Sequence, residues 1–460
     1  MEQVTAWLEG ASNNEFTVAG MPGSTFMALV RVILVILPIL TLVPGIIWWE
    51  RRLLSWMQDR IGPNRSGTIT LPNGRQIRTF GLIQPLLDGV KLFLKEEIKP
   101  SAVDRLIYVI APALALFPAF ALGATLPWTP HTGFWGHFSP AANIDIGILW
   151  VLAISSLGAY GIVLAGYSSN NKYSLMGGLR ASAQLISYEL AMGVSLACIA
   201  LATGSLKMTD MVAEQEKALW GVIPQVQNWF LFTPFGLLSA VIFLIALVAE
   251  TNRAPFDLPE AENELIAGYH TEYSSMKFAV FFMGEYAAMF VFSGVFAAVF
   301  MGGYHFMPFN YDELAVTFPS LSSFWYALRD LNYWLGPAGF LVKQVFMLSF
   351  FIWLRATLPR LRYDQLMNLG WKSLLPTSVA NFIIVGIWIV ATEMYGVLGG
   401  WVAFFGAVAL LALLYFNLVS ASRKSREAEQ RQAISLVDGT ERRSITLVDP
   451  APASSSGKTV

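Results

Sequence analysis

Residues 248–286 read VAETNRAPFDLPEAENELIAGYHTEYSSMKFAVFFMGEY and join two apolar runs of the chain. Arg253 is the only cation between the end of the first run and Lys277. Glu285 lies about ten residues inside the second run, ~15 Å along a helix and near the middle of a bilayer core of ~30 Å. The first run ends on an acid and five more acids precede the second run: Glu250, Asp257, Glu260, Glu262, Glu264 and Glu272.

So many carboxylates beside two membrane spans are costly to keep ionised together. Like charges and a low dielectric both raise the pKa of a carboxyl group, so we expect some acids of this loop to hold protons near neutral pH. The alternative is a solvated acidic loop that merely joins two helices. Glu285 weighs against that alternative, because an ionisable side chain deep in a span indicates a functional site.

The composition places the chain among polytopic membrane proteins. Of its 460 residues, 55% are hydrophobic and 13% are charged. The expected fold is therefore all-α, with a transmembrane domain over residues 1–420 and about nine transmembrane helices of the ~20 residues that a helix needs to cross. The apolar spans lie at roughly 27–49, 102–126, 146–167, 182–203, 232–251, 275–302, 336–358, 376–395 and 397–419.

The distribution of Lys and Arg predicts the orientation of these spans. Both residue types gather after spans one, three and seven and in the C-terminal tail, and they are scarce after spans two, four, six and eight. The positive-inside rule then puts the N-terminus outside and the C-terminus in the cytoplasm. The acidic loop after span five shares the cytoplasmic side with the basic segment 50–100. Residues 421–460 are rich in Ser, Arg and Glu and are expected to form a disordered cytoplasmic tail.

Several kinds of site are excluded by residue content. The net charge of −1 gives no footprint for nucleic acid. A single cysteine, Cys198, excludes a disulfide framework and a cysteine-ligated iron–sulfur cluster. The chain has no Walker A or GxGxxG pattern, so we expect no NADH site, no tightly bound cofactor and no metal site on it.

The basic segment 50–100 contains a second element of interest. Apolar residues between Leu82 and Leu94 recur at helical spacing, with Asp88 and Lys91 among them. This pattern predicts an amphipathic helix that lies at the membrane interface and is too short and too charged to cross. A plain surface anchor is the alternative.

Three stretches resemble the H subunit of NADH-quinone oxidoreductase, which is the quinone-site membrane subunit of respiratory complex I. They are ETNRAPFDLPEAENELIAGYHTEY (250–273), the segment that begins ERRLLSWMQDRIGPNRSG (50–67), and GAYGIVLAGYSSNNKYSLMGGLRASAQLISYEL (158–190). The likeness covers about residues 27–375, and the last two spans extend beyond the shortest members of that family. One departure is TITLPNGRQIRT (68–79), where Asn73-Gly74 between alternating side chains predicts a small inserted β-hairpin.

The resemblance implies residues for a quinone cavity and for proton coupling. The cavity residues are Glu50 and Arg51 at the inner end of span one, and Asp88, Lys91 and Glu96 on or beside the interfacial helix. The coupling residues form a chain of acids from the cavity into the membrane: Glu189, Glu250, Asp257, Glu260, Glu262, Glu264, Glu272 and Glu285.

Two parts of this assignment have simpler alternatives. Glu189 is expected ~12 Å along span four, where it must be neutral, paired or hydrated. Ser187 and Tyr188 are its hydrogen-bonding neighbours if they turn the same way, and a structural pair with a lysine is the alternative. Arg355 and Arg360 lie at the inner end of span seven and are interpreted first as snorkelling anchors.

The resemblance implies a membrane subunit of a proton-translocating NADH:quinone oxidoreductase in a bacterial cell membrane. Quinone would be the substrate, and the partners would be soluble iron–sulfur and quinone-site subunits, other membrane subunits and the lipid bilayer. One alternative is the equivalent subunit of a related energy-converting hydrogenase or dehydrogenase. Another is an independent ion transporter, which would be active alone. A purely structural anchor leaves Glu189 and Glu285 unexplained.

Overall fold

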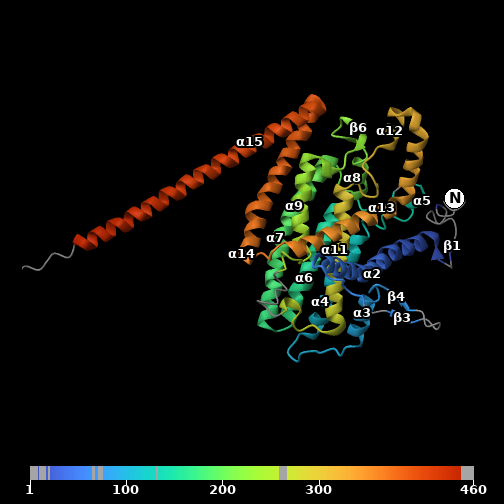
Figure 1. Cartoon of the computed structure of the whole chain (residues 1–460), viewed down its shortest axis with the longest axis horizontal. Coiled ribbons are helices and arrows are strands. Elements are labelled where there is room, and N and C mark those ends of the chain that lie inside the picture. Colours follow the sequence, from blue (N-terminus) through green and yellow to red (C-terminus); the bar gives the residue numbers. More distant parts are fainter. Residues whose placement is uncertain are drawn as a thin grey trace, which may run out of the picture. The chain divides into compact units, whose positions relative to one another are not determined.

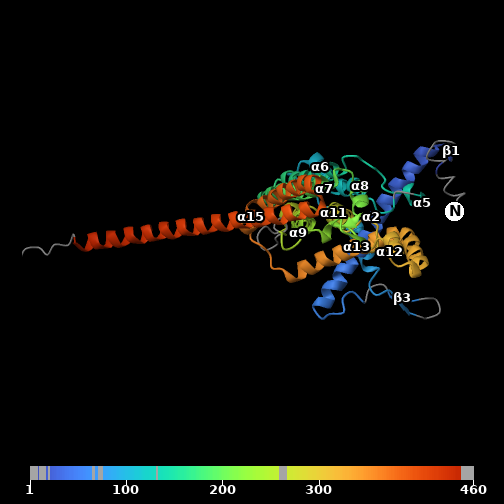
Figure 2. The same cartoon turned by 90° about the horizontal axis from the view of Figure 1, so that it is seen from above.

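The computed structural model is mainly helical (Figures 1 and 2). The chain forms two compact units, residues 1–389 and 390–460, and all the candidate site residues belong to the first. The described residues are 9, 17–18, 21–64, 68–70, 76–130, 133–257 and 267–446.

Seven helical runs within the described residues are long and apolar enough to cross a membrane. The chain is therefore a multi-pass membrane protein, as its composition predicts. These runs are α2 (Gly23–Met57), α4 (Arg105–Gly123), α6 (Gly147–Ser168), α7 (Lys172–Thr203), α11 (Ser275–Phe300), α13 (Ser322–Thr357) with the turn before it, and Tyr363–Leu413.

The predicted count of nine spans is not confirmed. Helix α9 (Pro234–Glu250) has 17 residues, so its length of ~26 Å falls short of a bilayer core of ~30 Å. The last run is continuous through α14 (Tyr363–Asn368), the π-helical segment η4 (Leu369–Leu374) and the first part of α15 (Leu375–Thr446). Inside α15 the backbone is non-helical at Gly396, with φ 78° and ψ 177°. That residue lies between the last two predicted spans.

Helix α15 also differs from the sequence prediction at its far end. It continues to Thr446, so residues 421–446 are helical where a disordered tail was expected from residue 421. Ala, Arg, Glu and Gln favour helix, and adding residues to an existing helix avoids the cost of nucleation. The cytoplasmic location of this segment stays a prediction.

Local sequence explains where the central helices begin. The side chain of Asp104 accepts two backbone N–H groups at the start of α4, and Asn171 accepts one at the start of α7. Thr233 caps α9, with Pro234 in the first helical position. Such caps satisfy N–H groups that have no partner within the helix.

Helices α4, α6, α7, α9 and α11 form the centre of the first unit, and small residues allow them to approach closely. A Cβ atom at Gly161 on α6 would lie 2.7 Å from the backbone nitrogen of Ala115 on α4, and one at Gly166 would lie 2.8 Å from the carbonyl oxygen of Ser174 on α7. Close backbone packing is how helices associate where lipid replaces water. Figure 1 shows α2 and much of α13 lying across these upright helices.

The two predicted elements of the basic segment are confirmed. Helix α3 (Gln84–Leu94) is the amphipathic helix, and its apolar side chains are largely exposed, as with Phe93 at 71%. Strands β3 (Thr68–Thr70) and β4 (Gln76–Arg78) pair antiparallel, with Ile69 opposite Ile77. The Asn73-Gly74 turn lies outside the described residues.

Short elements complete the connections. Two further antiparallel pairs, β1–β2 and β5–β6, were not predicted from the sequence. Strands β1, β2 and β5 have two residues each, too few to show an alternating pattern, and β6 contains a proline, which disfavours a strand prediction. The short elements are β1 (Thr17–Val18), β2 (Met21–Pro22), α5 (Gly133–Gly136), α8 (Met208–Glu214), β5 (Ala218–Leu219), β6 (Ile223–Gln227), η1 (Phe230–Phe232), η2 (Gly268–His270), α12 (Tyr311–Thr317) and η3 (Pro319–Leu321).

Candidate functional site

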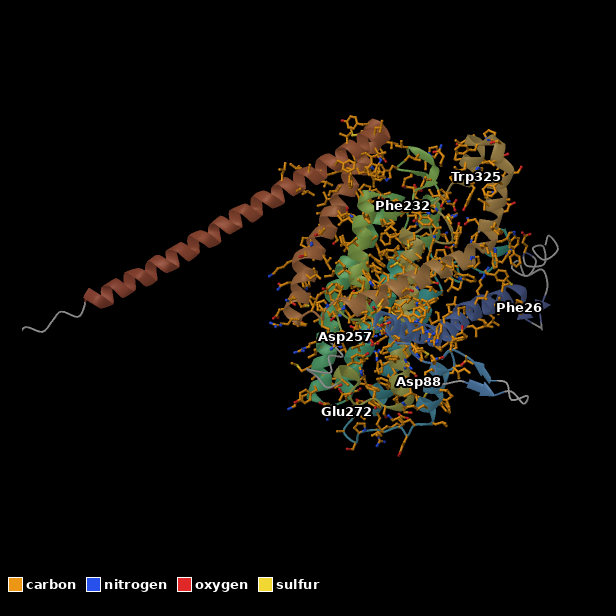
Figure 3. The ribbon with its side chains drawn as sticks, in the orientation of Figure 1. Phe26, Asp88, Phe232, Asp257, Glu272 and Trp325 are labelled. Carbon is orange, nitrogen blue, oxygen red and sulfur yellow. The ribbon has the colours of Figure 1, made fainter. Side chains whose placement is uncertain are left out.

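The predicted site residues that can be followed in Figure 3 gather at one end of the helices. Asp88, Asp257 and Glu272 lie toward the lower end in this view, and Phe232 and Trp325 lie toward the upper end. The acidic loop and the basic segment are thus on the same side of the helical unit, as the Lys and Arg distribution predicted.

Glu50 is the buried centre of a polar cluster at this end. The residue is 4% exposed, and its carboxylate receives a hydrogen bond of 2.6 Å from the hydroxyl of Tyr286 on α11. Arg355 on α13 donates to the same carboxylate, and Nη1 of Arg253 lies 3.5 Å from its Oε1. We call Glu50, Arg253, Tyr286 and Arg355 the Glu50 cluster. One acid faces two arginines, so the cluster carries a surplus of positive charge.

Arg253 is the buried cation of the Glu50 cluster. Its guanidinium carbon lies 4.2 Å from the centre of the Tyr286 ring, and 9% of the residue is exposed. Burial acts to lower the pKa of this guanidinium, but Tyr286, Glu50 and Glu285 outweigh burial and hold the pKa above its usual value. Its Nε and Nη2 atoms have no hydrogen-bond partner among the described residues. The cluster therefore keeps a fixed positive charge and two nitrogen atoms that can donate to a further acceptor.

A small central cavity lies beside the Glu50 cluster. Its volume is about 60 Å³, and its lining includes Glu250, Glu285, Asn252 and Tyr269. That volume exceeds the ~10–15 Å³ that one water needs on this measure, so the cavity can hold water. The hydroxyl of Tyr269 donates to Oε1 of Glu285 at 2.8 Å, whereas Oε2 of Glu250 is buried without a hydrogen-bond partner among the described residues. The predicted acids Glu250 and Glu285 thus share one cavity.

Two adjacent residue pairs connect the cluster with the cavity. Asn252 lines the cavity, and the next residue, Arg253, belongs to the Glu50 cluster. On α11, Glu285 lines the cavity, and the next residue, Tyr286, contacts the cluster. A displacement of the backbone at Arg253 or Tyr286 in the Glu50 cluster therefore also displaces Asn252 or Glu285 in the central cavity.

The turn that carries Asn252 is held from α7 by Gln184. The amide nitrogen of Gln184 donates to the carbonyl oxygens of Ala249 at 2.8 Å and Phe256 at 3.0 Å, and the residue is fully buried. These bonds satisfy a carbonyl at the end of α9 and fix the turn. Asn252 has φ 50°, a left-handed conformation that asparagine tolerates better than most residues.

Glu189 lies near the central cavity without the neighbours suggested for it. It is close enough to Glu250 for the two carboxyl groups to interact electrostatically. The hydroxyl of Tyr188 donates to the carbonyl oxygen of Leu366, and that of Ser187 donates to the carbonyl oxygen of Ala183. Both hydroxyls donate to backbone carbonyl oxygens, so Ser187 and Tyr188 do not form the hydrogen bonds to Glu189 that were expected if they turned the same way. No lysine pairs with Glu189 in the described part of the chain.

The remaining acids of the loop are held separately. Oδ2 of Asp257 lies 3.3 Å from Nη2 of Arg360, and Asp257 is 8% exposed. Oε1 of Glu272 accepts a hydrogen bond of 2.8 Å from the amide of Asn171. The predicted coupling residues Glu260, Glu262 and Glu264 lie outside the described residues.

The interfacial helix brings together two of the predicted cavity residues and leaves the others apart. Arg51 forms an ion pair of 2.8 Å with Asp88, and the amide of Gln84 donates to the same carboxylate at 3.0 Å. Lys91 and Glu96 are exposed. The cavity residues predicted from the sequence therefore do not form one group: Glu50 is buried in its cluster, and Arg51 pairs with Asp88.

The beginning of α11 holds the end of α3 and the segment that follows it. The hydroxyl of Ser275 donates to the carbonyl oxygens of Leu92 at 2.8 Å and Lys95 at 2.9 Å. Nζ of Lys277 lies 2.5 Å from Oε1 of Glu97. This hydrogen-bonded lysine holds the pKa of Glu97 below its usual value.

Sequence reasoning missed several of these partners. It treated Arg355 and Arg360 as membrane anchors, and it assigned no role to Tyr286 or Tyr269. Arg355 and Glu50 are 305 positions apart in the chain, so no local pattern could join them. Among the described residues no group of three His, Cys, Asp or Glu side chains is arranged to hold a metal ion.

The sequence pattern of a family described as NADH dehydrogenase matches residues 30–386. The H subunit of the NADH-quinone oxidoreductase of Ralstonia nicotianae is 43% identical over 367 residues, which cover 79% of this chain and 92% of the relative. The chain belongs to this family.

Two other relatives show that the match does not depend on one lineage. An H subunit of the same kind of enzyme from Geobacter metallireducens is 41% identical over 364 residues, covering 78% of this chain and 95% of the relative. The H subunit from Thermomicrobium roseum is 43% identical over 342 residues, covering 74% and 89%. The family match ends before Gly396 and includes every candidate site residue.

Proposed function

We propose that this chain is the membrane subunit of a proton-translocating NADH-quinone oxidoreductase, and that it forms a quinone chamber with adjoining soluble subunits. The observation that carries the proposal is the Glu50 cluster, a buried group with surplus positive charge beside a cavity lined by Glu250 and Glu285. The names of the relatives support the choice of reaction.

The Glu50 cluster suits the charge that develops during quinone reduction. Two electrons from an adjoining subunit and two protons convert a quinone to a quinol, and the electrons first place negative charge on the quinone oxygens. A fixed cation stabilises that charge without rearranging. At ~10 Å and an effective dielectric constant of ~20, one positive charge contributes ~1.7 kcal/mol, which is slightly more than one pK unit.

The adjacent pairs Asn252–Arg253 and Glu285–Tyr286 provide the route for coupling between the Glu50 cluster and the central cavity. A change of charge beside Arg253 and Tyr286 alters their interaction with Glu50. Asn252 and Glu285 are the next residues on the same backbone and face the central cavity. A proton then moves between Glu285 and Glu250 through the water that the cavity can hold, and Glu189 responds to the charge of Glu250.

In this proposal the other acids of the loop act as a reservoir of protons for the coupling residues. Glu272 and Asp257 lie at the end of the unit where the chamber would form, each held by a neighbouring polar side chain. We include Glu260, Glu262 and Glu264 in the reservoir on the strength of the sequence alone. Arg51, Asp88, Lys91 and Glu96 would line the approach for the quinone along α3.

The proposed setting is a bacterial cell membrane with the C-terminus in the cytoplasm. The partners would be soluble iron–sulfur and quinone-site subunits and the other membrane subunits of the complex. The chain would bind neither NADH nor a resident cofactor. An independent ion transporter, the alternative of another class, would be active as a purified single chain.

The test is Glu285→Gln in the assembled complex, with proton pumping and quinone reduction measured together in proteoliposomes. We expect both to fall while the subunit composition is unchanged. Glu313→Gln on α12 is the matched control, because Glu313 is an exposed acid outside the cluster and the cavity. Pumping at the control level in an assembled Glu285→Gln complex would refute the coupling role.

A further inference from the structure

An apolar groove between α2, α4, α11 and α13 has no part in the proposed reaction. Its volume is about 350 Å³. Gln344 and Trp128 carry the only polar side-chain atoms among its described lining residues. The amide nitrogen of Gln344 is already used, because it donates to the carbonyl oxygen of Phe290 at 3.3 Å.

Neither water nor empty space fills this groove well. A buried water needs two to four polar partners, and the lining offers few. An empty groove of this size deprives its lining of dispersion contacts, which makes voids costly in packed proteins. The groove therefore calls for an apolar occupant.

The groove is open to the outside of the unit on one side, between α2 and α13. Ala338 and Leu341 lie at its rim and are exposed, Leu341 at 37%. Val291 in its wall lies past the midpoint of α11, and Leu42, the lining residue of α2 nearest the Glu50 cluster, is about eight residues from Glu50, which is ~12 Å along the helix. On α11, Phe290 of the groove lies one helical turn beyond Tyr286, so the groove begins next to the Glu50 cluster and extends from there along α2 toward Leu34.

A cation and a tryptophan lie at the end of the groove nearest the N-terminus of α2. Arg31 precedes Leu34, Val35 and Pro38 by three, four and seven positions, so it shares their face of α2. Its Nε donates to the carbonyl oxygen of His137 at 2.7 Å, and its guanidinium carries further N–H donors. Trp128 lines the groove here, as expected at a membrane interface.

We propose that this groove binds one phospholipid of the outer leaflet. One acyl chain lies along the apolar lining between Pro38 and Ala338, and the phosphate lies at Arg31. Arginine is well suited to phosphate because its planar group donates two parallel hydrogen bonds. The observations favour a lipid over a protein helix, because the groove combines a dry channel with a cation at one end.

Photolabelling of the unmodified complex gives a test that needs no variant. The complex is reconstituted with a phospholipid that carries a photoactivatable group on its acyl chain, irradiated and digested. We expect labelled peptides from the groove walls of α2 and α13, and competition by unlabelled phospholipid. Labelling displaced by quinone instead of phospholipid, or no labelling of these walls, would overturn the proposal.

Substitution at the rim supplies the second test. Ala338→Phe fills the groove, and Val342→Phe on the same helix is the control, because Val342 is 56% exposed and does not line the groove. Mass spectrometry of lipids retained by the purified complex should show one phospholipid fewer per complex for Ala338→Phe and no loss for the control. Arg31→Gln should weaken retention. An unchanged lipid count in an assembled Ala338→Phe complex, or a protein helix seated in the groove of the complex, contradicts the proposal.

Discussion

Gly177→Ala is the sharpest test of the link between backbone packing and the acids of the central cavity. Gly177 lies on α7 against η2, and a Cβ atom there would lie 2.8 Å from the backbone nitrogen of Tyr269 and 2.9 Å from the carbonyl carbon of Gly268. Both are backbone atoms, so no flexible side chain can move aside. Reaching the 3.4 Å of an ordinary contact requires a shift of about 0.6 Å.

That shift is large enough to reach Glu285. The hydroxyl of Tyr269 donates to Glu285 at 2.8 Å. If Tyr269 moves by the full ~0.6 Å, the distance between the two oxygen atoms becomes ~3.4 Å, longer than an O–H···O hydrogen bond. Overpacking of this kind costs about 1–3 kcal/mol, and a hydrogen bond to a charged group contributes ~1.5–3 kcal/mol. At ~1.4 kcal/mol for each factor of ten, we expect coupled quinone reduction to fall by up to ~100-fold.

The assay is proton uptake by proteoliposomes that contain the purified complex, measured with the rate of quinone reduction. Gly193→Ala is the matched control on the same helix, because its Cβ would meet the flexible end of Leu152 at an ordinary 3.4 Å. Tyr269→Phe should reproduce the loss of coupling without overpacking. Normal coupling in both Gly177→Ala and Tyr269→Phe would refute the idea that the Tyr269–Glu285 bond matters.

Three further predictions concern the same end of the unit. Arg355→Gln removes one of the two cations that face the buried Glu50; because the Arg355 side chain is 38% exposed and Arg253 remains, we expect a loss of ~1–2 kcal/mol in thermal unfolding. In a double-mutant cycle, Glu50→Gln should recover part of that loss, and additive losses would contradict the pairing. Arg51→Gln breaks an ion pair whose arginine is 46% exposed, so stability should change by less than ~1 kcal/mol; a larger loss on the same measurement would show that the pair is not solvated. The bond to Lys277 lowers the pKa of Glu97, so the stabilisation is present above the ordinary value of 4.5 and is lost as the pH falls through the lowered pKa. Amide exchange after α3 should therefore accelerate on acidification through that range, and equal pH dependence in Glu97→Gln would exclude this cause.

The parts of the fold that depend on local pattern were predictable. The amphipathic helix α3 follows from apolar spacing, and the β3–β4 pair follows from alternation around Asn73-Gly74. The family could also be predicted, because the acidic loop carries a long distinctive segment. The predicted span 232–251 agrees with α9 (Pro234–Glu250) to within two residues, and whether this helix of 17 residues crosses the membrane stays a prediction.

The parts that depend on distant contacts were not predictable. The sequence around Gln184 does not indicate that this glutamine holds a distant turn. Its side chain nevertheless donates hydrogen bonds to the carbonyl oxygens of Ala249 and Phe256, which are 65 and 72 positions away. An arginine at a span end has the same local pattern whether it snorkels or pairs with Glu50. The family resemblance assigned Lys91 and Glu96 to the same cavity as Glu50, but both side chains are exposed. A resemblance can therefore assign residues to a site without showing which of them contact one another within this chain.

Helix geometry explains how one element serves both halves of the site. Successive residues on an α-helix point ~100° apart, so Glu285 and Tyr286 must face different neighbours. On α11 these neighbours are the central cavity and the Glu50 cluster. A small rotation of this part of α11 therefore moves the carboxyl group in the cavity and the hydroxyl at Glu50 together. A single-residue insertion after Glu285 would break this relation while preserving both side chains, and it should uncouple pumping more completely than either single substitution.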